Sequence, residues 1–338
     1  MASLTKKENF MRIMRGECPE WIPTYTFGKR PGDTEEPDTC KIMPGFISDY
    51  RRTDGAKDIW GVKHIIYKEG MGASIPEPGF ILLDDITKWR DVIKAPNLDD
   101  VDFEAMAKRD MERAGLNRNE TALIYNLHVG FFQNLMAFMG FSDGLMALLE
   151  EPEECQELLN YICDFYVDFA ERSIDYYKPD VYAITDDTAT EFTPFISLDI
   201  FREMFMPLYE RQAEVARKRG IPLEMHNCGK CEIFVEDWIK LGIRAWNPAQ
   251  PDNDLLAIKA KYGNELAFCG GFSYHGKLNF PDCPEDEFKA AVIDCIDKLA
   301  PGGGFAWGNF VLGRDEVSNR KNRWIREVLN TYGRDFYK

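Results

Sequence analysis

The sequence lacks the features of a membrane or secreted protein. No stretch of the 338-residue chain approaches the roughly 18 consecutive apolar residues that a membrane-spanning helix needs. The segment from Met1 to Phe10 is polar and charged, without the apolar core of a signal peptide. The nine cysteines are an odd number spread along a long chain, which does not indicate a disulfide framework. We therefore expect a cytoplasmic protein with reduced thiols and no membrane partner.

The chain also has fewer basic than acidic residues. The chain has 41 basic and 57 acidic residues, a formal net charge of −16, which argues against nucleic acid and anionic membranes as partners. No Gly-x-Gly-x-x-Gly follows a predicted strand, so a dinucleotide site has no support. No internal repeat or low-complexity tract is present. The composition, 45% hydrophobic and 29% charged, is that of a globular protein with a large core.

Short apolar runs alternate with longer helical runs along most of the chain. The expected strands are 21–27, 122–126, 181–185, 222–226, 243–246, 266–269 and 305–307, with an eighth from the region 58–83. The expected helices are 5–16, 131–150, 152–177, 198–219, 231–241, 252–262, 285–299 and 315–331. Residues 28–45 are expected to form a loop, and an acidic connector runs to about residue 118.

This alternation implies a parallel sheet covered by helices. Eight strands and the chain length favour a single α/β domain over residues 1–338, a (β/α)8 TIM barrel with an N-terminal extension and inserted loops. An open doubly wound sheet is the alternative. Within the helix 198–219, Pro207 predicts a kink.

The clearest indication of an active site is the run Glu224-Met225-His226-Asn227-Cys228-Gly229. Residues two apart on a strand face the same way, so Glu224, His226 and Cys228 are expected to point into the barrel mouth. An imidazole beside a thiolate is half of a zinc site, and a catalytic zinc needs a third protein ligand and an open position. By its position Cys269 is the first candidate for that ligand, followed by Glu224 and then Asp187.

Other interpretations of this run stay open. His226 and Cys228 also fit a hydrogen-bonded histidine beside a buried thiol, or a Cys–His nucleophile pair. Cys228 and Cys231 form a Cys-x-x-Cys, the spacing of a redox dithiol. The two residues between them, Gly229 and Lys230, are more typical of a strand-to-helix turn.

Further polar and aromatic side chains follow the predicted strands. Asp186 or Asp187 is expected to act as a general base, a substrate anchor or a partner of a metal ligand, with a helix cap or a solvated turn as the alternative. The residues expected to bind substrate in the mouth are His128, Trp246, Asn247, Trp307 and Asn309. Aromatic walls are expected from Trp246, Phe272, Tyr274, Trp307 and Phe310. Such walls suit an apolar or aromatic small molecule.

These motifs resemble those of the uroporphyrinogen-decarboxylase-like superfamily, and within it of the cobalamin-dependent methyltransferases. The stretch from Lys7 to Pro23 is similar to the first helix and strand of that superfamily, and Asp186 to Pro207 to its middle signature. The stretch Gly302-Gly303-Gly304-Phe305 matches the run before the last strand. The run His226-Asn227-Cys228-Gly229 matches the superfamily's His-x-Cys-Gly, which ligates zinc in the methyltransferases.

The resemblance implies a barrel whose zinc activates a methyl donor or a thiol acceptor, opposite a corrinoid carried by a separate small protein. Members that methylate thiols usually carry a third zinc-binding cysteine after the last strand, where this chain reads Trp307-Gly308-Asn309-Phe310-Val311. Cys269 would substitute, as in some members that act on the methyl donor. True uroporphyrinogen decarboxylases carry an arginine-rich loop after the first strand. Here Gly28-Lys29-Arg30-Pro31 precedes acidic residues, which would repel a polycarboxylate.

We therefore expect a zinc methyltransferase that moves a methyl group from a small methylated donor to the cobalt(I) of a partner corrinoid protein. Zinc would be held by His226 and Cys228 with Cys269 or Glu224, and Asp186 or Asp187 would protonate or orient the leaving group. The aromatic walls favour an aromatic methyl ether, so that the reaction is an O-demethylation. A homodimer is one assembly compatible with this expectation.

Three other functions stay open. One is the reverse half-reaction, from methylcobalamin to a thiol or a folate. A second is a metal-free decarboxylase-like lyase that uses the aspartates. The third is a binding or regulatory protein on an enzyme scaffold.

Overall fold

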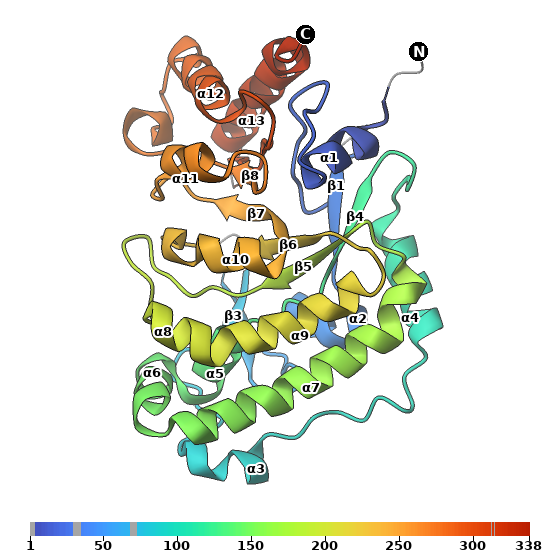
Figure 1. The fold of residues 1–338 in the computed structure, drawn as a ribbon, viewed down its shortest axis with the longest axis vertical. Helices are drawn as coiled ribbons and strands as arrows, with labels where there is room; N and C mark the ends of the chain where they lie inside the picture. The colour runs from blue at the N-terminus through green and yellow to red at the C-terminus, as the bar shows by residue number, and fades with distance from the viewer. Residues whose placement is uncertain (1–3, 30–34, 68–72, 312, 314) are drawn as a thin grey trace.

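The computed structural model describes residues 4–29, 35–67, 73–311, 313 and 315–338. A parallel sheet of seven strands curls in the order β1-β4-β5-β6-β7-β8-β9, and helices cover its outer face (Figure 1). Each crossover thus moves one position along the sheet, which is the arrangement of a (β/α)8 barrel and confirms the predicted fold class. The strands are β1 (Thr39–Ile42), β4 (Ala122–Asn126), β5 (Val181–Thr185), β6 (Leu223–His226), β7 (Ile243–Ala249), β8 (Ala267–Gly270) and β9 (Phe305–Ala306).

The barrel closes through the stretch that precedes β1. Thr24 pairs in parallel with Trp307, directly after β9. On the other side, the backbone N–H of Lys41 in β1 donates to the carbonyl of Phe27 at 3.2 Å. Residues 23–27 therefore occupy the eighth position of the barrel, between β1 and β9. The sequence predicted a first strand at 21–27. The segment does lie in the barrel, but its residues form only an isolated bridge.

Two predictions about this end of the barrel were wrong. β1 lies within 28–45, which was expected to be a loop, because its four residues are surrounded by glycine and proline. The described residues of the region 58–83 supply no barrel strand. Its strands β2 (His64–Tyr67) and β3 (Ala73–Pro76) pair with each other as a separate antiparallel hairpin. The expected acidic connector also contains a helix, α4 (Phe103–Ala114), which Asp102 caps by accepting the N–H of Ala105.

The other helices lie close to their predicted places. The predicted helix 131–150 is interrupted at Gly140, which gives α5 and α6. Pro207 has no N–H to bond the carbonyl of Glu203, and a π-helical turn over Phe201–Phe205 separates α8 from α9. The described helices are α1 (Lys6–Met14), α2 (Gly45–Ser48), α3 (Trp89–Val92), α4, α5 (Phe131–Met139), α6 (Phe141–Glu150), α7 (Pro152–Tyr177), α8 (Leu198–Ile200), α9 (Met206–Arg217), α10 (Val235–Leu241), α11 (Leu255–Tyr262), α12 (Glu285–Leu299) and α13 (Glu316–Val328).

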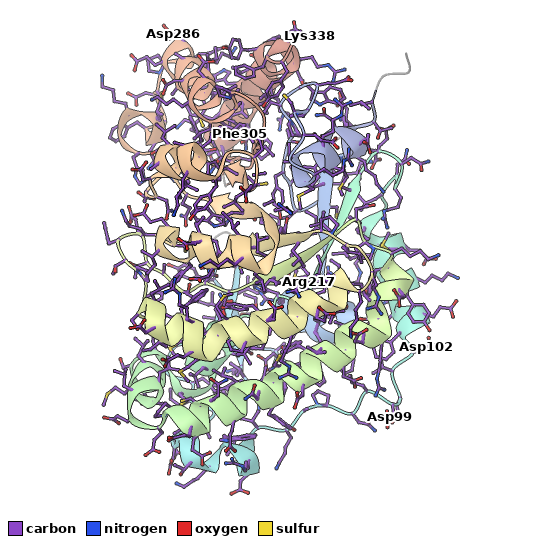
Figure 2. The ribbon with its side chains drawn as sticks, in the orientation of Figure 1. Asp99, Asp102, Arg217, Asp286, Phe305 and Lys338 are labelled. Carbon is purple, nitrogen blue, oxygen red and sulfur yellow. The ribbon has the colours of Figure 1, made fainter. Side chains whose placement is uncertain are left out.

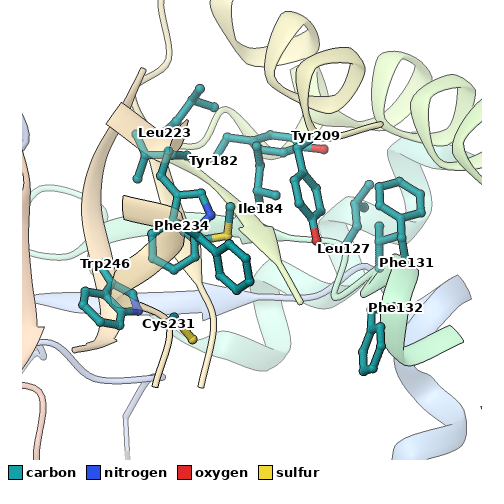
Figure 3. Packing of buried hydrophobic residues seen from close by; sticks show 14 of the residues in the cluster. Leu127, Phe131, Phe132, Tyr182, Ile184, Tyr209, Leu223, Cys231, Phe234 and Trp246 are labelled. Carbon is teal, nitrogen blue, oxygen red and sulfur yellow. The ribbon is translucent and has the colours of Figure 1, made fainter. Parts of the chain in front are cut away.

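The buried apolar side chains fall into two groups. The larger group fills the space between the sheet and its helices, where Tyr182 and Ile184 of β5 meet residues of the neighbouring elements (Figure 3). The smaller group lies inside the barrel, where Phe10 and Ile13 of α1 pack against strand residues such as Ala122. Helix α1 therefore closes one end of the barrel interior.

The surface of the molecule is largely charged. Acidic residues such as Asp99, Asp102 and Asp286 lie at the periphery, whereas Phe305 of β9 is buried (Figure 2). In the part of the chain that the structure describes, no helix is both long enough and apolar enough to cross a bilayer.

Candidate metal centre and active site

Strand β6 carries two polar side chains into the barrel. Leu223 and Met225 belong to the outer core, so the alternation of the strand turns Glu224 and His226 inward, as the sequence predicts. Cys228 lies two residues after His226, and its Sγ is 3.9 Å from Nε2 of His226. The imidazole and the thiol are therefore neighbours at the carboxyl end of β6, where barrel enzymes place their chemistry.

Asp187, which follows β5, completes a group of three possible metal ligands. One ligand atom each from Asp187, His226 and Cys228 lies within 4.8 Å of the other two. Tetrahedral zinc, with Zn–N of about 2.0 Å and Zn–S of about 2.3 Å, places nitrogen and sulfur about 3.5 Å apart. The measured 3.9 Å is close to that separation. Three protein ligands leave a fourth position for a substrate, which is the arrangement of a catalytic zinc site.

The surroundings of His226 suit a metal ligand. Its Nδ1 lies 2.9 Å from Oδ1 of Asn247, so an Nδ1–H donated to Asn247 leaves Nε2 free to bind a metal. Burial, with a smaller contribution from the positive charge of Lys41, lowers the pKa of His226 to about 3. The imidazole is therefore neutral near pH 7, the form that binds metal ions.

Cys228 and Asp187 are joined by hydrogen bonds. The backbone N–H of Cys228 donates to Oδ1 of Asp187 at 2.9 Å, and the side-chain amide of Gln133 donates to Oδ2 at 2.6 Å. Burial and the adjacent carboxylate raise the pKa of the Cys228 thiol well above its usual value, and burial raises the pKa of Asp187. The thiol is therefore protonated until a cation displaces its proton.

These protonation states bear on the alternative interpretations of the Cys-x-x-Cys run. Cys231 is buried, and its thiol donates to the carbonyl of Cys228 at 2.9 Å. Burial raises the pKa of Cys231 well above its usual value, as it does for Cys228. A redox dithiol and a nucleophilic cysteine both need a lowered thiol pKa, so the surroundings favour a metal ligand instead.

The structure does not bring Cys269 and Glu224 into the metal group. Cys269 lies fully buried inside the barrel, and burial followed by the charge of Glu224 raises the pKa of its thiol well above the usual value. Glu224 accepts a 2.6 Å hydrogen bond from the hydroxyl of Tyr25 and lies 3.3 Å from the ammonium of Lys41. The sequence ranked Cys269 and Glu224 above Asp187 as the third ligand, whereas the geometry favours Asp187.

Asp186 has a structural position. Its carboxylate accepts the backbone N–H groups of Phe132 and Gln133 at 3.0 and 3.2 Å, and the hydroxyl of Tyr209 at 2.7 Å. These bonds cap the first turn of α5, which is the capping alternative raised from the sequence. Burial raises the pKa of Asp186 to about 6. Since Gln133 contacts Asp187, Asp186 holds the helix that orients the proposed ligand.

The expected aromatic walls lie elsewhere. Trp246 packs in the core outside the barrel, among the residues of Figure 3. It alternates along β7 with the inward-facing Asn247, and its indole N–H donates to the carbonyl of Asn227 at 3.0 Å. Trp307 is also buried in the outer core, and its ring centroid lies 5.1 Å from that of Phe272. These rings brace the strands and do not line the mouth.

The remaining predicted side chains have varied positions. Asn309 accepts the backbone N–H of Phe272 at 3.1 Å and so braces two loops. Tyr274 packs against Phe288 of α12, at 6.4 Å between ring centroids, and Phe310 is partly buried against the same outer core. His128 lines a cavity that Gln133 also lines, and its predicted contact with substrate stays a prediction.

A largely apolar pocket nevertheless adjoins Asp187. Its volume is about 460 Å³. It is lined by Phe80, Phe132, Met136, Phe141 and Phe195, together with Gln133 and Asp187. An aromatic pocket is thus present, built by α5, α6 and the loops before α3 and α8 rather than by the late strands.

Sequence reasoning missed three residues of the site. Lys41 has a side chain only 5% exposed and lies 3.3 Å from Nδ1 of His226. Tyr25 and Gln133 make the contacts to Glu224 and Asp187 described above. A lysine between Cys40 and an isoleucine is a weak signal of an inward-facing charge, and nothing in the sequence marks the tyrosine or the glutamine.

Comparison with known proteins identifies the family. The family model described as uroporphyrinogen decarboxylase (URO-D) matches residues 63–308, which include all three proposed metal ligands. The chain belongs to this family. This URO-D family member also shares its fold with a methyltransferase from Methanosarcina mazei, with a TM-score of 0.60 at 13% identity over 98% of this chain and 99% of that chain. No curated protein sequence matches it.

Proposed function

We propose that this URO-D family member is a zinc-dependent methyltransferase that moves a methyl group from a small methylated donor to the cobalt(I) of a corrinoid protein. The observation that carries the proposal is the grouping of Asp187, His226 and Cys228 within 4.8 Å. The methyltransferase from Methanosarcina mazei, which has the same fold, supports the class of reaction.

The residues of the site fit a zinc ion. Asp187, His226 and Cys228 would hold it, and the bound zinc would supply a Lewis acid for the heteroatom that leaves the methyl group. Asn247 orients the imidazole through Nδ1, and Gln133 fixes the carboxylate of Asp187. These contacts set the directions of the ligand atoms before the ion binds.

An aromatic methyl ether is the donor that the site favours. The pocket of about 460 Å³ beside Asp187 is lined by phenylalanines and is large enough for a substituted ring. A ring held there places an ether oxygen near the proposed ligands, and the apolar walls exclude water from the reacting atoms.

The rim of the barrel mouth supports a protein partner. Several large apolar side chains are exposed at the end of a barrel segment or in the stretch that follows one, and exposed apolar surface is typical of interaction sites. They are Phe27, Phe192, Ile233, Leu256 and Phe280. A corrinoid protein that docks on this rim would bring its cobalt to the open side of the metal group.

Two measurements on purified protein test the proposal. Elemental analysis is expected to find about one zinc per chain, as in a catalytic site. Zinc should be lost in Cys228→Ser and His226→Ala but retained in Cys269→Ser, the matched control in which another buried thiol is removed. With free cob(I)alamin as acceptor, the conversion to methylcobalamin is followed by absorbance with a methoxylated aromatic donor.

The alternatives predict other results. Absence of zinc after metal-replete growth would exclude the proposed mechanism and favour the metal-free lyase. Methylation of a thiol or a folate by methylcobalamin, without demethylation of the ether, would favour the reverse half-reaction. Equal loss of zinc in Cys269→Ser would return Cys269 to the ligand set.

A further inference from the structure

A second, polar cavity shares Gln133 with the apolar pocket. Its volume is about 160 Å³, similar to cavities of roughly 150 Å³ that hold a benzene molecule. Residues of η1 (Asp49–Arg52), strand β2, the loop after β4 and helix α5 form its walls. Because Gln133 lines both cavities and donates to Asp187, a ligand here is adjacent to the proposed metal ligands.

The cavity contains an arginine without an acidic partner. Among the described residues, no carboxylate lies within ion-pairing distance of the Arg51 guanidinium, which packs 5.3 Å from the ring centroid of Tyr50. Its neighbour Arg52, in contrast, pairs with Asp49 at 3.2 Å. In a chain of net charge −16, an arginine that faces a cavity without a carboxylate partner indicates that an external anion completes its contacts.

A buried histidine offers a second unfilled contact. His64 is 6% exposed, and its Nε2 lies 3.0 Å from Oδ2 of Asp58. Its Nδ1 is buried and has no hydrogen-bond partner among the described residues. A buried polar atom without a partner costs free energy. An anion bonded there would accept Nδ1–H from a doubly protonated ring, whose Nε2–H is donated to Asp58.

His128 is the third polar side chain that lines the cavity. Its backbone is left-handed, with φ of 50°, which is uncommon for residues other than glycine. The conformation is held by Asn126, whose side-chain oxygen accepts the N–H of His128 at 2.6 Å. Non-glycine residues in this region cluster at ligand sites, where the surrounding structure maintains them.

The cavity also contains one acidic group among its described lining residues, Asp58. Its Oδ1 accepts the backbone N–H groups of Trp60 and Val62, both at 2.9 Å, and its Oδ2 faces His64. The hydrogen bonds of Asp58 are therefore made to residues 60, 62 and 64, and no ion pair joins it to Arg51 among the described residues.

We propose that Arg51, His64 and His128 form a subsite for a carboxylate carried by the methylated substrate. That the ligand is methylated rests on the proposed function. That it carries an anionic group is inferred from the contacts of the cavity alone. A substrate anchored by its carboxylate at Arg51 would extend past Gln133 towards Asp187. The enzyme would then select methylated acids over neutral analogues of the same shape.

Calorimetric binding to the zinc-loaded protein, without corrinoid, tests the subsite. The probes are 4-methoxybenzoate and the neutral 4-methoxybenzamide. The wild type is expected to bind the acid about 10- to 100-fold more tightly, the range for a hydrogen-bonded charged group. Arg51→Met should abolish that preference and Arg51→Lys should retain part of it. Arg52→Met, which removes the neighbouring arginine outside the cavity, should leave it unchanged.

Several results would overturn the subsite. They are equal binding of acid and amide by the wild type, no binding of either, or an unchanged preference in a folded Arg51→Met protein. Tighter binding of inorganic phosphate than of the acid would assign the cavity to a phosphate. If Arg51→Met does not fold, the subsite is tested by the acid-over-amide preference of the wild type and of His64→Phe. An unchanged preference in His64→Phe would then overturn it. Because no methyl group is transferred here, an Arg51-dependent preference without turnover would retain the subsite and reject the proposed reaction.

Discussion

Cys228 and His226 meet the protonation requirement of a metal ligand in opposite ways. The imidazole is already neutral, because burial lowers the pKa of His226 to about 3, whereas burial and Asp187 hold the Cys228 thiol protonated. Binding of zinc must therefore displace one proton near neutral pH, and that proton comes from the cysteine. The affinity of the site for zinc should follow the titration of this single thiol.

The apparent zinc affinity is expected to rise about tenfold for each pH unit between about pH 6.5 and 8.5, because one proton leaves per ion bound. The protons released per zinc are measured in weakly buffered solution, and the zinc affinity at each pH is measured by competition with a chelator. Cys228→Ser should bind weakly, with little pH dependence. A dependence of two protons per zinc would show that His226 is protonated in the free protein and would contradict the assignment.

Single residues were the hardest part of the site to predict. His226 and Cys228 are visible in the sequence because they lie two apart on a strand with a glycine turn behind them. The third ligand depends on how deep a side chain lies in the barrel, and strand position does not give depth. Cys269 was therefore preferred over Asp187.

Helix α5 shows how one element sets the geometry of another. Its first turn is held by Asp186, and one of the residues so held, Gln133, hydrogen-bonds to Asp187. Two adjacent aspartates thus have different tasks, one structural and one in the metal group. Both roles were predicted as alternatives for the pair. The sequence could not separate them, because the capped helix begins more than fifty residues earlier in the chain.

The two tasks can be separated by substitution. Asp186→Ala leaves four donors without an acceptor, namely the hydroxyl of Tyr209 and the backbone N–H groups of Phe132, Gln133 and Asp187. It is expected to lower the free energy of unfolding by about 3 kcal/mol. Tyr209→Phe removes one of these bonds and should cost about 1 kcal/mol. Asp187→Ala, at a half-buried position that water reaches, should change stability by less than about 1 kcal/mol but remove zinc. Urea unfolding and metal analysis check these values, and equal destabilisation by both alanine variants would contradict the division.

At the scale of the whole molecule, the barrel is closed by residues that are distant in the sequence. The regular alternation from β4 onward made the barrel predictable, since each helix covers the sheet between consecutive strands. The beginning of the chain was less predictable. Its two contributions, residues 23–27 and β1, are short and lie among prolines and glycines, so neither shows the pattern of a regular barrel strand.

Removal of residues 1–27 is expected to leave the edges of β1 and β9 unpaired and the barrel interior open. Unpaired strand edges associate with other chains, so the truncated protein should elute as aggregates in size-exclusion chromatography. Its calorimetric unfolding should lack the single transition expected of the full chain. A monomeric truncated protein with an unchanged melting temperature would show that closure contributes nothing to the fold.

The pairing of Thr24 with Trp307 has a consequence for biosynthesis. A nascent chain leaves the ribosome with its first barrel segment long before the partner strand is translated. Until β9 emerges, the growing sheet has two open edges, and the apolar interior that α1 covers is exposed at the side. The protein gains a continuous ring of strands only once β9 has left the ribosome, so the period of greatest risk of aggregation is translation itself.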